Sequence, residues 1–127
     1  MILKNLEDAI KSSWGKDTCY PASANEWTKK NPAFGQCAVT AIVVQDYLGG
    51  EILSCKSLHH YYNQLPNFTI IDLTKSQFPD GTLIKSDGPA TRNYLLNGES
   101  AERAKTRERY EILKKRVSEK YSLLYGI

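Results

Sequence analysis

Apolar residues near the N-terminus recur with the period of an α-helix. Leu3, Leu6, Ile10 and Trp14 are spaced by three, four and four residues, so they share one helix face, and Gly15 follows as a stop signal. The pattern predicts an amphipathic helix that packs its apolar face on another element.

A second, more apolar helix is expected after a long polar segment. The chain from Asp17 to Gly35 is rich in Pro, Asn, Ser, Thr and Gly, which indicates a loop, and loops of this length often carry binding groups. The helix should begin near Gln36 and end at the Gly49-Gly50 pair, where glycine supplies the C-cap. Apolar residues surround much of this helix, so we expect it to be central and buried.

Three β-prone runs follow in quick succession, at 51–55, 59–65 and 68–74. The short connection Pro66-Asn67 predicts an antiparallel hairpin between the last two runs. A two-residue turn would set Tyr61 opposite Asp72, so His60 and Asp72 would differ by one position in register. A slip, a bulge or a longer loop would bring these two side chains to one face.

The rest of the chain contains one clear helix. Thr74 and Gln77 have capping-box spacing for a short turn, and residues 79–93 are rich in turn signals without a periodic element. Ser100 can cap a long helix whose apolar face is formed by Tyr110, Leu113, Val117, Tyr121 and Leu124. We therefore predict one α+β domain over residues 1–127, with a central buried helix and flanking helices packed on a small antiparallel sheet.

Composition and charge exclude several classes of protein. The chain is 41% hydrophobic and 24% charged, as in ordinary globular domains, and its net charge of +3 is small. The basic C-terminal segment is interspersed with Glu, which favours a solvated helix face over a nucleic-acid site. No apolar run reaches the roughly 20 residues of a membrane span, and the first residues lack a signal-peptide pattern. We expect a cytoplasmic protein, a monomer or weak dimer, with no membrane or nucleic-acid partner.

The three cysteines are Cys19, Cys37 and Cys55. An odd count without CxxC spacing argues against a disulfide framework and against a zinc site, so we expect free thiols, no metal and no cofactor. Cys37 differs from the other two because it lies at a helix start, where amide N–H groups favour a thiolate. Cys19 and Cys55 have no titratable neighbour in sequence and are expected to be structural.

Cys37, His60 and Asp72 have the residue types and order of a thiol catalytic site. Such chemistry needs a thiolate, a base that returns the proton to a leaving group, and an acceptor that orients the base. Each residue also has a simpler explanation: Cys37 as a small core residue, His60 as a satisfied strand histidine, and Asp72 as a cap of the turn that follows it. Gln36, Trp27 and Asp17 are the candidate substrate-binding residues.

The sequence resembles the YunG-like family of uncharacterised bacterial proteins. The resemblance rests on W-x-x-D-T from Trp14 to Thr18, on G-Q-C-A-V-T-A from Gly35 to Ala41, and on H-Y-x-N with I-D-L-T from His60 to Thr74. Tyr62 stands where the family pattern has Trp. The order of Cys, His and Asp further resembles papain-like, NlpC/P60-like and transglutaminase-like folds, a likeness of topology that implies a papain-like cysteine hydrolase.

Two functions of different classes follow. The first is a thiol hydrolase or acyl transferase acting on an amide, ester or isopeptide bond of a small-molecule or peptide substrate, with Cys37 as nucleophile, His60 as base and Asp72 as its orienting partner. Papain-like enzymes place an oxyanion-hole Gln several residues before the Cys, whereas here Gln36 directly precedes it. The second is a non-catalytic module that binds a small molecule or peptide on the same fold.

Overall fold

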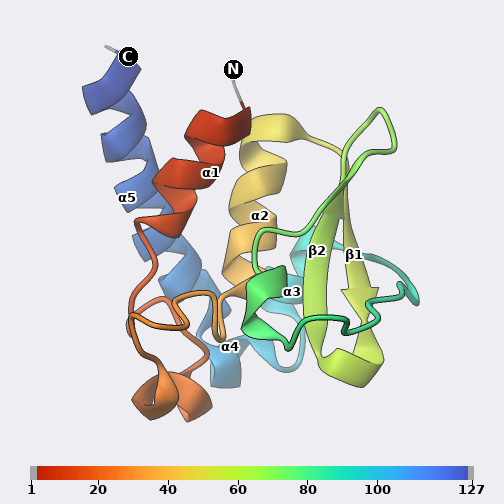
Figure 1. The fold of residues 1–127 in the computed structure, drawn as a ribbon. Coiled ribbons are helices and arrows are strands. Elements are labelled where there is room, and N and C mark those ends of the chain that lie inside the picture. Colours follow the sequence, from red (N-terminus) through yellow and green to blue (C-terminus); the bar gives the residue numbers. More distant parts are fainter. Residues whose placement is uncertain (1–2, 126–127) are drawn as a thin grey trace.

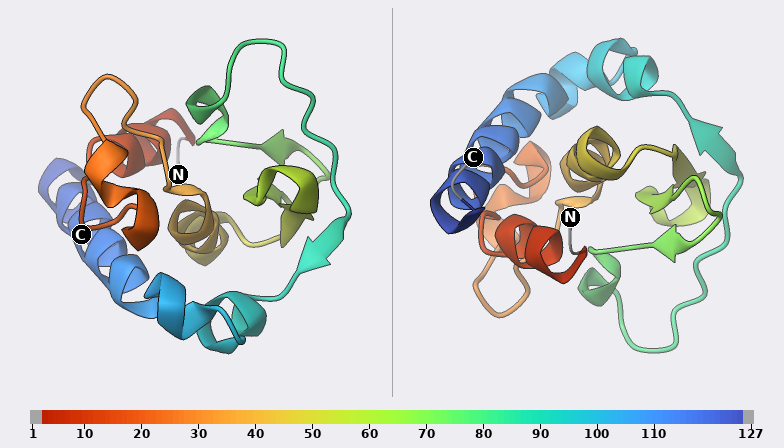
Figure 2. Two further views of the ribbon diagram at one scale, coloured as in Figure 1. Left: turned by 90° about the horizontal axis from the view of Figure 1, so that it is seen from below. Right: turned by 90° about the horizontal axis from the view of Figure 1, so that it is seen from above.

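The computed structural model describes residues 3–125, with side chains described as far as Tyr121. Helix α2 (Cys37–Leu48) lies between a four-stranded sheet and the two helices α1 (Leu3–Lys11) and α5 (Thr106–Tyr125) (Figures 1 and 2). The described residues therefore form the α+β arrangement that the sequence predicts, with α2 buried at the centre.

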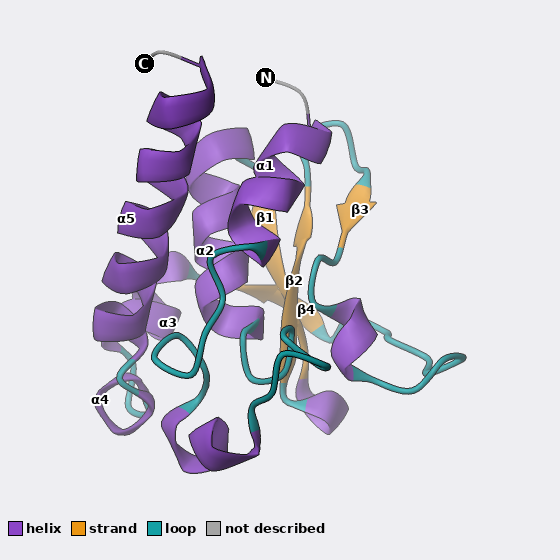
Figure 3. Cartoon of the chain, turned by 60° about the vertical axis from the view of Figure 1, so that its left-hand side comes forward, coloured by secondary structure: helices purple, strands orange, loops and turns teal. Residues whose placement is uncertain are grey.

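The core lies where α2 meets its neighbours. Leu6 and Ile10 of α1, Ile42 of α2, Ile52 of the sheet and Leu113 of α5 are all fully buried in one cluster. Figure 3 shows α1, α2 and α5 gathered on one side of the strands. No helix among residues 3–125 is both long and apolar enough to cross a membrane.

The sheet has the strand order β3-β2-β1-β4, and neighbouring strands are antiparallel. Its strands are β1 (Glu51–Cys55), β2 (His60–Gln64), β3 (Ile70–Ile71) and β4 (Gly88–Ala90). The hairpin between β1 and β2 crosses a short 3₁₀ turn, η2 (Lys56–Leu58), and then His59, whose φ of 49° lies in the left-handed region.

The β2–β3 register is shifted by one residue from the register that a two-residue turn would give, and this shift determines whether His60 and Asp72 can meet. Gln64 pairs with Ile70, and Leu65 donates its N–H to the Thr69 carbonyl, so the loop has three residues and ends at Phe68 with a φ of 70°. This is the common hairpin in which the last loop residue is left-handed. Extending the register places Asp72 opposite Tyr62, on the same side of the strand pair as His60.

The turn-rich segment contains two elements that periodicity did not predict, the edge strand β4 and the short helix α3 (Arg92–Asn97). The Thr91 side chain caps α3 by accepting from the Tyr94 N–H. Both elements are too short to show a period, and Pro89 is tolerated because β4 is at the sheet edge.

The predicted C-terminal helix is interrupted. Ser100 begins the short helix α4 (Ala101–Ala104) without a side-chain cap bond, and Lys105, with a φ of 51°, separates α4 from α5. Of the predicted apolar face of α5, Tyr110, Leu113, Val117 and Tyr121 are buried. The Leu124 side chain lies outside the described residues.

The predicted first helix is also shorter than expected. It ends at Lys11, and Trp14 follows in a loop, where its indole N–H donates to the Thr40 hydroxyl at 2.9 Å. The predicted loop at 17–35 contains the 3₁₀ segment η1 (Pro21–Glu26), and the predicted turn near Thr74 is η3 (Lys75–Gln77).

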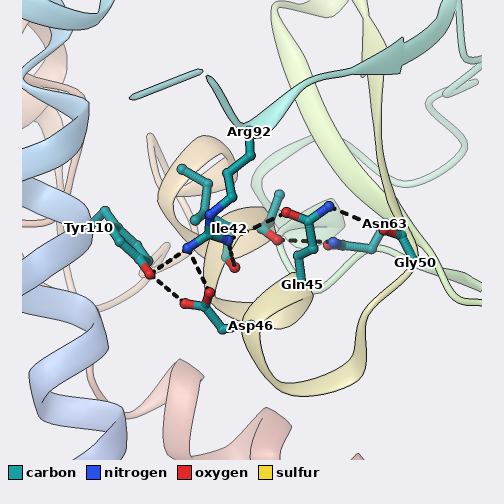
Figure 4. A network of polar contacts seen from close by, with 8 residues as sticks. Ile42, Gln45, Asp46, Gly50, Asn63, Arg92 and Tyr110 are labelled. Carbon is teal, nitrogen blue, oxygen red and sulfur yellow. Dashed lines mark hydrogen bonds and ion pairs between the residues drawn. The ribbon is translucent and has the colours of Figure 1, made fainter. Parts of the chain in front are cut away.

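A polar network joins α2, α3 and α5 (Figure 4). The guanidinium of Arg92 donates to the Tyr110 hydroxyl at 2.7 Å and pairs with Asp46 at 2.6 Å, and the Tyr110 hydroxyl donates to Asp46 at 2.5 Å. Burial and the Asp46 carboxylate raise the pKa of Tyr110 to about 12. The network therefore holds α3, and with it the end of β4, against the helical layer.

Replacing Tyr110 by phenylalanine should destabilise the protein by about 1–3 kcal/mol, because it removes a buried hydroxyl that both donates and accepts while leaving the Arg92–Asp46 pair. Urea unfolding of the variant and the wild type measures this difference. An unchanged midpoint would show that the hydroxyl bonds contribute nothing net.

Candidate functional site

His60 and Asp72 form a hydrogen-bonded pair in the interior. The His60 Nε2 lies 2.7 Å from Asp72 Oδ2, and the two side chains are only 0% and 9% exposed. His60 begins β2, and Asp72 directly follows β3, so the hairpin register described above brings them together. Asp72 bonds His60 rather than capping η3, whose N-cap residue is Thr74.

Two aromatic rings fix the plane of the His60 imidazole. Tyr62 stacks on it with centroids 5.7 Å apart, and Phe78 meets it edge-on at 4.9 Å. Burial lowers the pKa of His60, but the hydrogen bond to Asp72 and the interaction with Cys37 outweigh burial and raise that pKa to about 9. The imidazolium form is therefore stabilised between two acidic groups.

Cys37 is the first residue of α2 and is partly exposed. Its Sγ lies 3.7 Å from the carbonyl oxygen of His59, to which the thiol can donate. The Nδ1 of His60 is buried and has no hydrogen-bond partner among the described residues. Since Cys37 also raises the pKa of His60, the thiol and the ring lie close together, and the resting thiol proton is directed to the backbone. Catalytic hydrogen bonds are often loose in free enzymes and tighten when substrate binds.

A buried cation supports the loop that leads into Cys37. The Arg109 guanidinium donates to the carbonyl oxygens of Thr18 and Gly35, at 3.0 and 3.4 Å, and its Nε donates to Ala104. Burial lowers the pKa of Arg109, and Cys37 is the largest of the neighbours that oppose this. Arg109 thus connects α5 to the start of α2 and places a positive charge near the thiol.

A cavity of about 640 Å³ lies along the sheet beside His60. Tyr61, Tyr94 and Thr91 line it together with Lys56. Burial raises the pKa of Tyr61, and Tyr94 and then Cys37 add to the rise. The site therefore adjoins a space large enough for a small molecule or a peptide side chain.

A second cavity, of about 420 Å³, lies on the other side of the pair. Asp72, Phe78, Lys11 and Lys75 are among the residues that line it. The second carboxylate oxygen of Asp72 is buried and has no partner among the described residues. His60 thus lines the first cavity and Asp72 the second, whereas Cys37 lines neither.

The three candidate substrate-binding residues lie in the supporting structure. Gln36 is fully buried, and its Nε2 donates to the Gly15 carbonyl at 3.0 Å. The Trp27 indole donates to the Pro32 carbonyl at 2.9 Å within the loop. Asp17 forms an ion pair with Arg116, and the hydrogen bond to Arg116 lowers its pKa. These contacts hold the 17–35 loop, and none of the three side chains lines either cavity described above.

The other two cysteines are buried, and Cys55 pairs with His60 across β1 and β2. Burial raises the pKa of Cys19. A hydrogen bond to Ser57 lowers the pKa of Cys55, which is only 2% exposed. Both fit the structural role predicted for them, and no group of metal-ligating side chains occurs among the described residues.

Three residues near the site were not predicted from the sequence: Arg109, Tyr61 and Tyr94. Gln77 was predicted only as part of a capping box with Thr74. Arg109 lies in a segment rich in charges, and its burial depends on contacts 74 and 91 residues away. The two tyrosines are separated by the whole turn-rich segment. Arg109 lies next to Tyr110, which belongs to the buried apolar face of the final helix. A charged residue at the edge of such a face is the pattern that could have indicated its burial.

Comparison with known proteins gives a relative and a family. The chain is 35% identical over 78 residues to "Uncharacterized protein YunG" of Bacillus subtilis (strain 168). The aligned segment covers 60% of this chain and 63% of the relative. The chain thus spans less than two thirds of the length of that relative. No solved structure matches it. The model of the family described as YunG protein matches residues 2–122, nearly the whole chain. The chain belongs to the YunG family.

Proposed function

We propose that this protein is a thiol hydrolase or acyl transferase that acts on an amide, ester or isopeptide bond. The observation that carries the proposal is the buried His60–Asp72 pair at 2.7 Å. The Nδ1 of this ring has no hydrogen-bond partner among the described residues, and Cys37, at the start of α2, raises the pKa of His60. A buried histidine that uses one nitrogen on a carboxylate and leaves the other unpaired costs stability. The arrangement is explained if that nitrogen exchanges a proton with Cys37.

The chemistry follows from the roles of the three groups. In the reactive ion pair, the His60 imidazolium holds the proton and Cys37 is a thiolate, whose sulfur attacks the acyl carbon, so that a C–S bond forms and the carbonyl oxygen becomes an oxyanion. When the C=O bond reforms, the bond to the leaving group breaks, and the His60 imidazolium protonates the departing amine or alkoxide. Water, or an acceptor nucleophile, then cleaves the thioester. Asp72 holds the ring and stabilises its charged form throughout.

Two further features support a negatively charged sulfur at this place. The first N–H groups of α2 have no partners within the helix, and no side chain caps its N-terminus. The buried guanidinium of Arg109 adds a second positive influence. The partial exposure of Cys37 leaves room for a reagent.

Cys37 should therefore be the first of the three cysteines to be alkylated. Brief treatment of the native protein with iodoacetamide at about pH 6, followed by mass mapping, measures this, because an imidazolium-paired thiolate reacts at a pH where an ordinary thiol of pKa about 8.5 does not. Cys55 is the internal competitor, since its pKa is lowered although it is buried. Earlier labelling of Cys55 or Cys19 would remove the main support for the proposal.

The cavity beside His60 also favours the second candidate function, a module that binds a small molecule or peptide without turning it over. Under that function, Cys37→Ala keeps ligand binding intact and the wild type shows no burst of acylation with an activated ester. The two functions thus differ in whether a covalent intermediate accumulates on Cys37.

A further inference from the structure

Acyl transfer at Cys37 requires hydrogen-bond donors for the oxyanion, and Gln36 is not available for this. Its Nε2 donates to the Gly15 carbonyl, and the residue is fully buried. The backbone N–H of Cys37, as the first of α2, provides one donor. A preorganised site normally presents a second donor from a different element.

Gln77 occupies the position from which such a donor can come. It is the last residue of η3, which directly follows the loop from Asp72, and the next residue is Phe78, whose ring contacts His60. On its other side, the Gln77 Oε1 accepts from the Gly35 N–H at 3.4 Å, two residues before Cys37. Gln77 therefore bridges the histidine side and the cysteine side of the site.

The amide of Gln77 is only half satisfied. With Oε1 bound to the Gly35 N–H, the orientation of the amide is fixed, because exchanging oxygen and nitrogen would bring two donors together. The Nε2 is buried and has no hydrogen-bond partner among the described residues. An amide N–H₂ held this way is a donor without an acceptor, at the junction of the groups that would act on a carbonyl.

We propose that the Gln77 Nε2 donates to the oxyanion that forms when Cys37 attacks an acyl carbonyl. The inference rests on the proposed function and narrows it, because a built oxyanion donor commits the site to carbonyl substrates. Gln77 is then a catalytic residue that touches the reacting oxygen, with the Cys37 N–H as the second donor.

The test compares two reactions of the same thiol in the full chain. With p-nitrophenyl acetate, sulfur attacks the carbonyl carbon, an oxyanion forms, and the C–O bond breaks to release p-nitrophenolate. With 2,2′-dithiodipyridine, sulfur attacks sulfur, the S–S bond breaks, and 2-thiopyridone leaves without any oxyanion. In Gln77→Glu, which keeps an oxygen for the Gly35 N–H and removes the donor, acetylation should fall by about 100-fold. Disulfide exchange should be unchanged.

Ser76→Glu is the matched control, because it adds the same charge on the same turn at an exposed position. It should leave both reactions unchanged, and Gln77→Leu should repeat the loss of acetylation without the added charge. Unchanged acetylation in Gln77→Glu and Gln77→Leu overturns the inference, and so does an equal loss of both reactions, which would show that Gln77 only braces the site. If wild-type Cys37 reacts with neither reagent faster than the unfolded chain does, the proposed function fails and takes the inference with it.

Discussion

Replacing His60 by glutamine should lower the rate at which Cys37 is alkylated at pH 6 by about 100-fold, because an unassisted thiol is well under 1% thiolate at that pH. The side chain of His60 is 0% exposed and lies between Asp72, Phe78 and Tyr62, and its pKa is raised by Cys37, so its loss removes the imidazole that interacts with the thiol. Glutamine keeps a donor for Asp72 and avoids leaving an unpaired carboxylate in the interior. Iodoacetamide kinetics followed by mass spectrometry measure the change.

His59 provides the control for this experiment. It is exposed and also lines the cavity beside His60, and its backbone carbonyl lies 3.7 Å from the Cys37 Sγ. Because its φ is 49°, asparagine is the suitable replacement, since asparagine tolerates the left-handed conformation. His59→Asn should alkylate like the wild type. Equal slowing in both variants would mean that the two substitutions act through the loop and that neither ring serves Cys37.

Urea midpoints for both variants separate chemistry from folding. An imidazole that only fills space would lower the midpoint of His60→Gln while leaving the alkylation rate of the folded fraction unchanged. A base would lower the rate in protein that is still folded. The proposed role of His60 requires the second result.

The candidate site was accessible from sequence because its chemistry is concentrated in short motifs. A Cys after Gly-Gln at a helix start, a His that opens a strand and an Asp that follows the next strand are local features, and the structure brings the His and the Asp together at 2.7 Å. Their meeting depended on hairpin register, which a two-residue turn gives wrongly. The left-handed Phe68 adds the one loop residue that puts His60 and Asp72 on the same side, and Phe in that conformation is too uncommon to predict.

The parts that were missed depend on contacts between distant segments. Arg109 is buried through carbonyl oxygens of the 17–35 loop, and the orientation of Gln77 is set by Gly35, 42 residues earlier. The helix α3 has six residues and is held by Arg92 against α2 and α5, so no period of its own predicts it. Periodicity identifies elements that bury a face, whereas short elements and polar anchors are fixed by tertiary contacts.

The stability of the protein should fall as the pH rises from about 6.5 to about 9. The pKa of His60 is raised to about 9 in the folded state, against an ordinary value of 6.5. The folded protein therefore binds this proton more tightly than the unfolded chain does. The stabilisation is complete below pH 6.5 and is lost as the pH rises through the folded pKa. At about 1.4 kcal/mol for each pKa unit, the loss amounts to about 3 kcal/mol. Urea midpoints at pH 6 and pH 9.5 measure it.

Asp72→Asn should remove most of this pH dependence and slow the alkylation of Cys37 at the same time. The carboxylate makes the hydrogen bond that contributes most to raising the pKa of His60, and an amide can donate to or accept from the ring but cannot neutralise an imidazolium. Between pH 6.5 and 9 the difference in unfolding free energy should therefore shrink, and the alkylation rate at pH 6 should fall toward that of His60→Gln.

Asp72→Ala distinguishes this role from a purely structural one. If Asp72 only braced the turn before η3, asparagine would replace it well, and alanine alone would cost about 0.5–2 kcal/mol. The pH dependence and the alkylation rate of Asp72→Asn would then match the wild type, and the site would reduce to a Cys37–His60 dyad. Since the Asp72 carboxylate bonds His60 at 2.7 Å and only its backbone carbonyl accepts from η3, at the Lys75 N–H, we expect both variants to lose reactivity. Alanine should also lose stability because it leaves the imidazolium buried without a partner.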